Sequence, residues 1–150
     1  MIWFSSPCNP SGSLYGKEEL AALAKVILKY PNIYVVSDEI YEHINYTGKP
    51  HASMAQVEGM FDRTVTVNGV SKSFAMTGWR IGYIAFNQSS QLDALRENLP
   101  KLARVRIATN LPVQYAALES LRGPQGYISE FVSELKKRRD LVVKRLNSMP

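Results

Sequence analysis

Two features of the sequence predict an α/β fold, with a mostly parallel sheet between two layers of helices in a three-layer αβα arrangement. Short runs rich in β-branched and aromatic residues alternate with longer segments of helical periodicity, as in sheets whose parallel strands are joined by helices. Residues 33–37 are almost wholly apolar, which is typical of a strand that is buried on both faces. The 150 residues are enough for one compact domain of this class.

The strands and helices follow from these local patterns. Four strands are predicted, over residues 1–6, 33–37, 64–68 and 81–86. The last of them is expected at an edge of the sheet or antiparallel to its neighbour. Four helical patterns cover residues 17–28, 91–102, 113–121 and 127–149. The second of these is expected to break at Pro100, because proline lacks the amide donor and its ring clashes with the preceding turn.

Charge and composition narrow the function classes. The net charge is +5, and the densest basic run covers residues 136–139. Glu130, Glu134 and Asp140 are interleaved with this run, which indicates the solvated face of an amphipathic helix rather than a nucleic-acid surface. The apolar runs are strand-sized, so no membrane span is predicted. Cys8 is the single cysteine, which excludes an internal disulfide and favours a reducing, cytoplasmic compartment.

Polar residues follow the first three predicted strands, where an α/β sheet collects its ligands. They are Asn9 after the first strand, Asp38 and Tyr41 after the second, and Lys72 after the third. Pyridoxal phosphate requires such a set, because it forms an imine with an amine and needs a carboxylate to keep its ring nitrogen protonated. Arg80 adds a planar cation that suits a phosphate group. The residues therefore favour this cofactor.

Three motifs resemble those of one enzyme family. The segment SKSFAMTGWRIGY, residues 71–83, resembles the lysine-attachment motif of class I and II aminotransferases, which are fold type I pyridoxal-phosphate enzymes. NPSG at residues 9–12 resembles the family's turn, and SDEIYEHI at residues 37–44 resembles its strand-end motif. The first half of the chain is similar to aspartate or prephenate aminotransferases, whereas residues 101–118 are similar to alanine-type relatives.

The resemblance implies a role for each matching residue. Lys72 would hold the cofactor as an imine and move a proton during the reaction, and Asp38 would pair with the pyridinium nitrogen. Tyr41 and Asn9 would hydrogen-bond the phenolate oxygen of the cofactor. Arg80 would bind its phosphate group.

Ser71 is a further candidate for contact with the cofactor. Many relatives carry a phosphate-binding serine three positions before the lysine, where this chain has Gly69. No metal site is expected, because His43 and His51 have no partners at metal-ligand spacing.

Several of these assignments have a structural alternative. Asp38 could cap the turn that follows it, and Asn9 could simply begin a turn. Tyr41 could serve packing, and Arg80 could form a surface ion pair. The motif context favours the functional interpretation of all four.

The resemblance also implies how the whole protein is organised. Residues 1–125 would form part of the large cofactor-binding domain, and residues 126–150 would form the long helix that leads to a small domain. The family has a large portion before the NPSG turn, so the chain is expected to be an internal fragment with an exposed sheet edge. The complete protein would be a homodimer.

Amino transfer between an amino acid and a 2-oxo acid is the predicted activity, with an aspartate-like substrate favoured. Two other functions share the fold and the lysine motif. One is a pyridoxal-phosphate-dependent lyase that breaks carbon–sulfur bonds or catalyses β-elimination. The other is a non-catalytic, aminotransferase-like module that senses a ligand for a transcriptional regulator.

Overall fold

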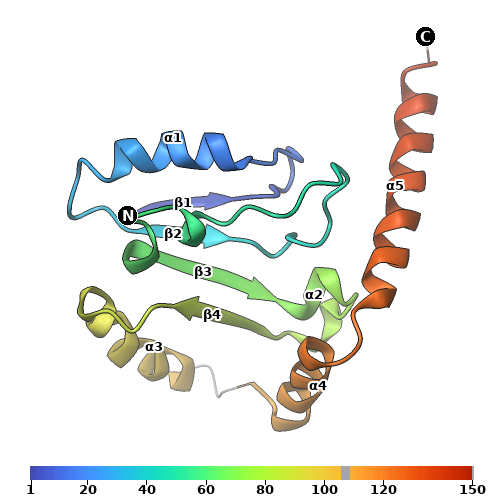
Figure 1. Ribbon diagram of the computed structural model, residues 1–150. Helices are drawn as coiled ribbons and strands as arrows, with labels where there is room; N and C mark the ends of the chain where they lie inside the picture. Colours follow the sequence, from blue (N-terminus) through green and yellow to red (C-terminus); the bar gives the residue numbers. More distant parts are fainter. Residues whose placement is uncertain (106–108, 150) are drawn as a thin grey trace.

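A computed structural model describes residues 1–105 and 109–149 of the chain (Figure 1). Its sheet consists of β1 (Ile2–Ser5), β2 (Val35–Asp38), β3 (Thr64–Gly69) and β4 (Gly82–Phe86), in this order across the sheet. The first three strands run parallel, and β4 runs antiparallel to β3. The sheet is therefore mostly parallel, and β4 is both antiparallel and at an edge, as predicted.

The register of the parallel strands aligns their carboxyl ends. Ser5 at the end of β1 pairs with Asp38 at the end of β2, and Asp38 pairs with Val67 near the end of β3. β2 begins two residues later than predicted, because the amide of Ile33 donates to the carbonyl of Tyr30 at 3.1 Å and is part of a turn. The segments that follow all three strands consequently emerge at one edge of the sheet.

One face of the sheet carries the main apolar core under α1 (Lys17–Ile27). Apolar residues recur at helical spacing in α1, so Leu20, Ala24 and Ile27 lie on the same stripe and are fully buried. Burial of the larger side chains, Leu20 and Ile27, contributes roughly 1.5–3 kcal/mol each. Two short 3₁₀ turns, η1 (Met54–Gln56) and η2 (Phe61–Arg63), belong to the segment that closes this core with Met54 and Met60.

The second face of the sheet is approached by α3 (Asp93–Val105). Ile84 and Phe86 lie on this face. Side chains alternate along a strand, and the residues of β3 that pair with these two point away from α1. Together with Leu99 and Leu102 of α3 they line a shared groove. Helices on both faces confirm the predicted three-layer α/β class.

α3 runs through Pro100, so the predicted break in this helix is wrong. Proline at this position removes one backbone hydrogen bond, to the carbonyl of Arg96. No residue of α3 is fully buried, so water can reach that carbonyl in place of the missing amide. The cost of the proline is therefore a bent or weakened turn rather than the end of the helix.

The remaining helices and 3₁₀ turns lie within the Lys72 motif and between it and the end of the chain. They are α2 (Val70–Ser73), the 3₁₀ turns η3 (Thr77–Trp79) and η4 (Ser90–Leu92), α4 (Leu111–Arg122) and α5 (Gly126–Leu146). α4 starts two residues earlier than predicted, with Pro112 in its first turn, where a missing amide costs no helical bond. None of the helices in the described part of the chain is long and apolar enough to span a membrane.

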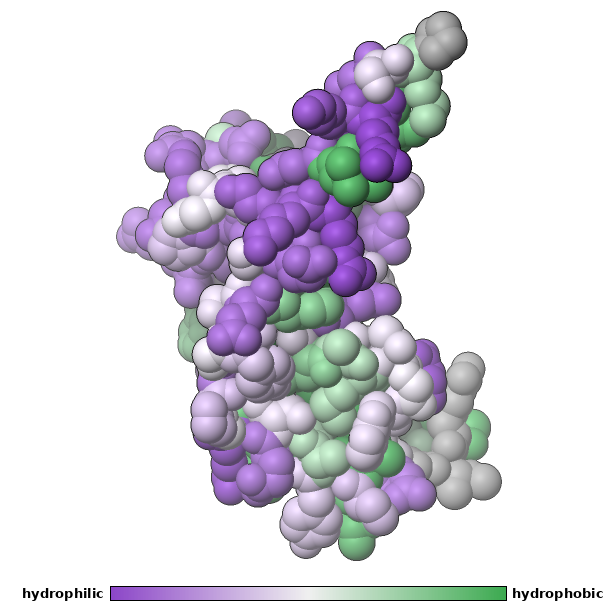
Figure 2. Space-filling view, turned by 90° about the vertical axis from the view of Figure 1, so that its right-hand side faces the viewer, coloured by the Kyte–Doolittle hydropathy of each residue, from purple (hydrophilic) through white to green (hydrophobic). Residues whose placement is uncertain are grey.

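α5 stands beside the sheet and extends past it toward the carboxyl end of the chain (Figure 1). Figure 2 shows hydrophilic side chains gathered over the upper part of this side of the molecule, where α5 lies, and hydrophobic ones below them. The basic run is exposed, and Arg138 pairs with Glu134 one turn earlier at 2.9 Å. The predicted solvated face is therefore confirmed.

Candidate functional site

The NPSG turn follows β1 at the edge where the parallel strands end. The amide of Gly12 donates to the carbonyl of Cys8 at 2.8 Å, which closes the turn. Gly12 has a φ of +72°, a conformation that side-chain-bearing residues rarely adopt, so the glycine of this motif is explained by the backbone. Asn9 lies exposed at the start of the turn.

Asp38 ends β2 at the same edge and is half-buried. Its Oδ1 accepts a hydrogen bond from the amide of Ile40 at 3.1 Å, so the capping role considered from the sequence is present. Within residues 1–105 and 109–149, no hydrogen bond engages its Oδ2. One carboxylate oxygen therefore holds the turn, and the other is available to a ligand.

The Lys72 motif forms a loop whose two ends are paired. Gly69, the last residue of β3, stands opposite Gly82, the first residue of β4. A Cβ on Gly82 would lie 2.9 Å from the carbonyl oxygen of Asn68, and one on Gly69 would lie 3.0 Å from the Cα of Gly82. Because the strands approach so closely, only glycines fit at both positions without a shift. Lys72 and Arg80 are thus both held beyond the carboxyl end of β3.

Tyr41 is where the three segments meet. Asn9 donates from Nδ2 to the Tyr41 hydroxyl at 3.3 Å. The Nζ of Lys72 lies 5.5 Å from the centre of the Tyr41 ring. An amide, a phenol and an amine from three different strand ends therefore converge. A cavity of about 300 Å³ lies beside Tyr41 and is also bordered by Cys8 and Arg139.

Arg80 and Ser71 do not join this convergence. Arg80 is exposed, and its Nη1 donates to the carbonyl of Thr77 at 2.8 Å. No hydrogen bond or ion pair links Arg80 or Ser71 to Lys72, Asp38 or Tyr41 in the described part of the chain. The surface ion pair considered for Arg80 is likewise absent there, so its guanidinium group still has free donors.

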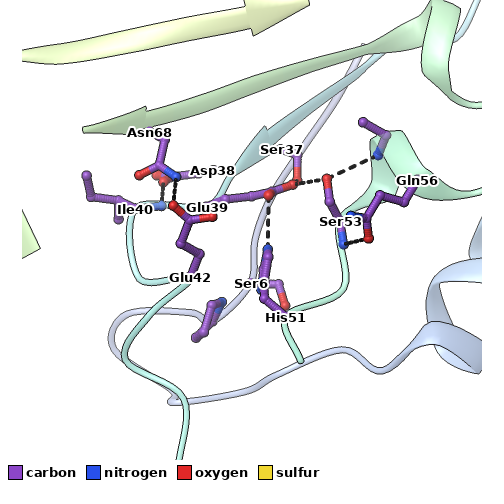
Figure 3. A network of polar contacts seen from close by, with 12 residues as sticks. Ser6, Ser37, Asp38, Glu39, Ile40, Glu42, His51, Ser53, Gln56 and Asn68 are labelled. Carbon is purple, nitrogen blue, oxygen red and sulfur yellow. Dashed lines mark hydrogen bonds and ion pairs between the residues drawn. The ribbon is translucent and has the colours of Figure 1, made fainter. Parts of the chain in front are cut away.

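A buried polar network, absent from the sequence-based expectations, lies next to this site (Figure 3). Its centre is Glu39, of which only 4% is exposed. Oε1 of Glu39 accepts hydrogen bonds from Ser37 at 2.8 Å and from Ser53 at 2.6 Å. Its Oε2 lies 2.9 Å from Nε2 of His51. Both oxygens of this carboxylate are therefore satisfied.

Glu42 extends the network toward the Lys72 motif. Its Oε1 accepts a hydrogen bond from Nδ2 of the buried Asn68 at 2.8 Å, and Asn68 directly precedes Gly69. A carboxylate oxygen of Glu39, one of Glu42 and a ring nitrogen of His51 lie within 4.8 Å of one another. Since the Glu39 oxygens already accept three hydrogen bonds, we interpret this cluster as a hydrogen-bond network.

The network changes the titration of two groups. Burial raises the pKa of Glu39, but the hydrogen bonds from His51, Ser53 and Ser37 outweigh burial, so its pKa lies below the ordinary glutamate value. Burial raises the pKa of Tyr83, and the negative charges of Glu42 and Glu39 add to this shift. Glu39 is therefore ionised at neutral pH although it is buried.

The sequence carries only a weak signal of this network. Glu39 and Glu42 flank Tyr41 inside a recognised motif, but His51 is separated from Glu39 by twelve positions without regular structure between them. The pairing of His51 with a buried carboxylate arises only in the folded chain.

Comparison with known proteins places the chain among relatives of one kind. The sequence model of the family described as aminotransferase class I and II matches residues 1–149. The aspartate/prephenate aminotransferase of Cereibacter sphaeroides is 41% identical, over 96% of this chain and 35% of its own length. The aspartate aminotransferase of Pinus pinaster is also 41% identical, over 99% of this chain and 30% of its own length. The chain thus spans about a third of the length of these relatives.

Solved structures agree with the sequence comparison. The alanine aminotransferase of Pyrococcus furiosus superimposes with a TM-score of 0.89 at 40% identity, covering 99% of this chain and 37% of that one. The aspartate aminotransferase of Rhizobium meliloti superimposes with a TM-score of 0.86 at 37% identity, over 98% of this chain and 36% of its own. The chain therefore belongs to the class I and II aminotransferase family.

Proposed function

We propose that the protein containing this chain transfers an amino group between an amino acid and a 2-oxo acid, with pyridoxal phosphate bound through Lys72. The observation that carries the proposal is the convergence of Lys72, Tyr41 and Asn9 from three strand ends, in a chain that belongs to the aminotransferase family. The activity concerns the whole protein, of which the chain represents about a third if its length is that of the relatives.

The donor set suits this cofactor group by group. Lys72 offers the amine that binds the aldehyde carbon, and Asp38 has one carboxylate oxygen left for the protonated ring nitrogen. The Tyr41 hydroxyl and the Asn9 amide are already oriented toward each other and can share the phenolate oxygen. The exposed guanidinium of Arg80 can donate two parallel bonds to a phosphate. The residues present therefore fit pyridoxal phosphate.

The chemistry divides between the cofactor and the residues around it. When bound, pyridoxal phosphate supplies an electron sink for negative charge at the α-carbon of the substrate. Lys72 would move the α-proton on its Nζ, because this amine lies beside Tyr41, where the three segments meet. Asp38 keeps the ring nitrogen protonated, and its own position is held by the bond from Ile40 to Oδ1. Ser71 is proposed as an additional contact beside Lys72.

The substrate class follows from the relatives. The relatives named above include aspartate/prephenate and aspartate aminotransferases, and this supports an aspartate-like amino acid as the amino donor. A lyase and a ligand-sensing module share the lysine motif, but the relatives and structures named above are all aminotransferases. Amino transfer is therefore the better-supported activity.

The organisation of the complete protein is proposed on the same ground. Residues 1–125 form part of the cofactor-binding domain, and residues 126–150 contain the helix that leads out of it. α5 begins at Gly126, which agrees with this division. The complete protein is a homodimer in a cytoplasmic, reducing compartment, which suits its single free cysteine.

Borohydride reduction of the complete protein loaded with pyridoxal phosphate tests the assignment of Lys72. Peptide mapping should find the reduced pyridoxyl group on the peptide of residues 71–83. A Lys72→Arg variant should lose the label, whereas the exposed loop variant Lys49→Arg should keep it. Transfer from aspartate to a 2-oxo acid should disappear in Lys72→Arg alone. Label on a lysine other than Lys72 would refute the assignment.

A further inference from the structure

Tyr41 lies in a tight turn, residues 39–42, between two acidic side chains. The amide of Glu42 donates to the carbonyl of Glu39 at 2.9 Å, which closes the turn around Tyr41. The amide of Glu39 donates to the carbonyl of Val67 at 2.9 Å, which attaches the turn to β3. Backbone hydrogen bonds therefore close this turn and attach its first residue to β3.

Each of the two side chains is fastened to a different part of the chain. Glu39 binds Ser37 in β2 and, through His51 and Ser53, the segment that returns toward η1 (Figure 3). Glu42 accepts from Asn68, the residue before the Gly69–Gly82 pair that holds the Lys72 motif. Tyr41 therefore has a fixed attachment on either side, one to the core and one to the segment that carries Lys72.

The centre of the network and Asp38 lie on opposite faces of the sheet. Glu39 shares the face of Ser37, whereas Asp38 points to the other face because side chains alternate along β2. Glu39 is buried among protein atoms, and both of its oxygens are occupied. Its ionised carboxylate forms charge-assisted bonds, which are stronger than neutral ones and hold their partners in a narrower range of positions.

We propose that Glu39, His51 and Glu42 are positioning residues. They hold the Tyr41 hydroxyl where it meets the phenolate oxygen of the cofactor, in a fixed position relative to Lys72. The inference rests on the proposed function of Tyr41 and Lys72. Displacement of a reacting group by about 1 Å costs up to about a hundredfold in rate. Loss of the network should therefore lower kcat by about ten to a hundredfold, although none of its members touches the reacting atoms.

Two measurements on the complete protein distinguish positioning from simple stabilisation. The first is the fluorine resonance of Tyr41 in cofactor-free protein labelled with fluorotyrosine, identified by its absence in Tyr41→Phe. The second is the pH midpoint of the absorbance change of bound pyridoxal phosphate. Glu39→Gln and His51→Ala should move the resonance, and should move the midpoint in the direction seen in Tyr41→Phe. His51→Gln should restore both, because its amide can again donate to Glu39.

Thr64→Val is the matched control. Thr64 is buried and donates to the carbonyl of Met60 at 2.8 Å. It lies at the start of β3, at the end of the strand opposite to the site. This variant should lower the melting temperature and leave the resonance and the midpoint unchanged. His51→Ala is included because its partly exposed side chain is easier to remove than that of Glu39.

The outcomes separate the two proposals. If Glu39→Gln and His51→Ala lower only the melting temperature, the network is structural and the positioning role is refuted. A moved resonance with an unchanged midpoint refutes it as well. If the wild-type protein holds no cofactor at Lys72, the proposed function fails, and the Tyr41 resonance alone then decides whether the network positions this residue.

Discussion

At the scale of single residues, the proposed site combines groups that would face a ligand with groups that hold them in place. Lys72 and Tyr41 are half-buried and converge with the exposed Asn9, whereas Glu39 is buried and both of its carboxylate oxygens are hydrogen-bonded. Asp38 belongs to both classes, because one of its oxygens caps the turn and the other stays free. Substitutions that distinguish the two oxygens can therefore separate structure from chemistry.

Asp38→Asn and Asp38→Ala should differ in a defined way. Asparagine keeps an oxygen that accepts from Ile40, whereas alanine loses this cap at a cost of about 0.5–2 kcal/mol in unfolding free energy. Both variants lack the charge that keeps the ring nitrogen protonated, so both should lose several orders of magnitude in kcat and bind the cofactor somewhat more weakly. Steady-state kinetics and thermal unfolding give the comparison. Near-normal turnover in Asp38→Asn would reduce Asp38 to a cap.

Glu39 should make stability depend on pH in the acid range. Its pKa is depressed in the folded state, so its contribution is present above the unfolded value of about 4.3 and is lost as pH falls through the lower folded value. The groups that face it are His51, Glu42 and Tyr83. The difference in unfolding free energy between wild type and Glu39→Gln should therefore shrink below about pH 4. Denaturant titrations at several pH values measure it, with Thr64→Val expected to show a pH-independent difference.

At the scale of elements, the Lys72 motif is a loop clamped by two glycines. This clamp explains why the motif is bounded by Gly69 and Gly82, for which the sequence alone offers no reason. The clamp also concerns the phosphate contact for which Ser71 is a candidate. A serine at position 69 would place its Cβ 3.0 Å from the Cα of Gly82. A serine at that position would therefore require its neighbours to shift by a few tenths of an ångström.

Gly82→Ala should destabilise the protein by about 1–3 kcal/mol, because the new Cβ would lie 2.9 Å from a backbone oxygen that cannot move aside. The same substitution at Gly78, in the same motif, meets no atom within 4 Å and should change stability little. Chemical denaturation of both variants provides the comparison. Equal stability of the two would show that the β3–β4 end can open at no cost.

At the scale of the whole molecule, the described chain leaves much apolar surface in contact with solvent. Trp3 on the edge strand β1 is 63% exposed, and Leu111 and Tyr115 of α4 are each 62% exposed. Apolar side chains on an unpaired strand edge are a liability in a soluble protein. Other parts of the complete protein, including the partner of the proposed homodimer, would cover this surface.

Light scattering of the complete protein should therefore give the mass of two chains at the concentration used for assays. Activity per chain should fall on dilution if the second chain contributes to the site, because dissociation would then uncover it. A monomer that retains full activity at working concentration would contradict the proposed assembly.

Local patterns determined the α/β class, the order of strands and helices, and the motifs that identify the family. These features depend on residues close together in the chain, such as the apolar stripe of α1 and the glycine of the NPSG turn. They also predict that Asn9, Tyr41 and Lys72 follow neighbouring strands, and the parallel register brings these strand ends together.

The tertiary structure alone decided three other features. Pro100 is tolerated inside α3 because that helix is exposed, which depends on what packs against it. The Gly69–Gly82 contact arises from strand pairing across a loop. The Glu39–His51 pair joins residues twelve positions apart through burial and charge. Local sequence patterns do not show which distant residues will contact each other, since burial and pairing exist only once distant segments of the chain have come together.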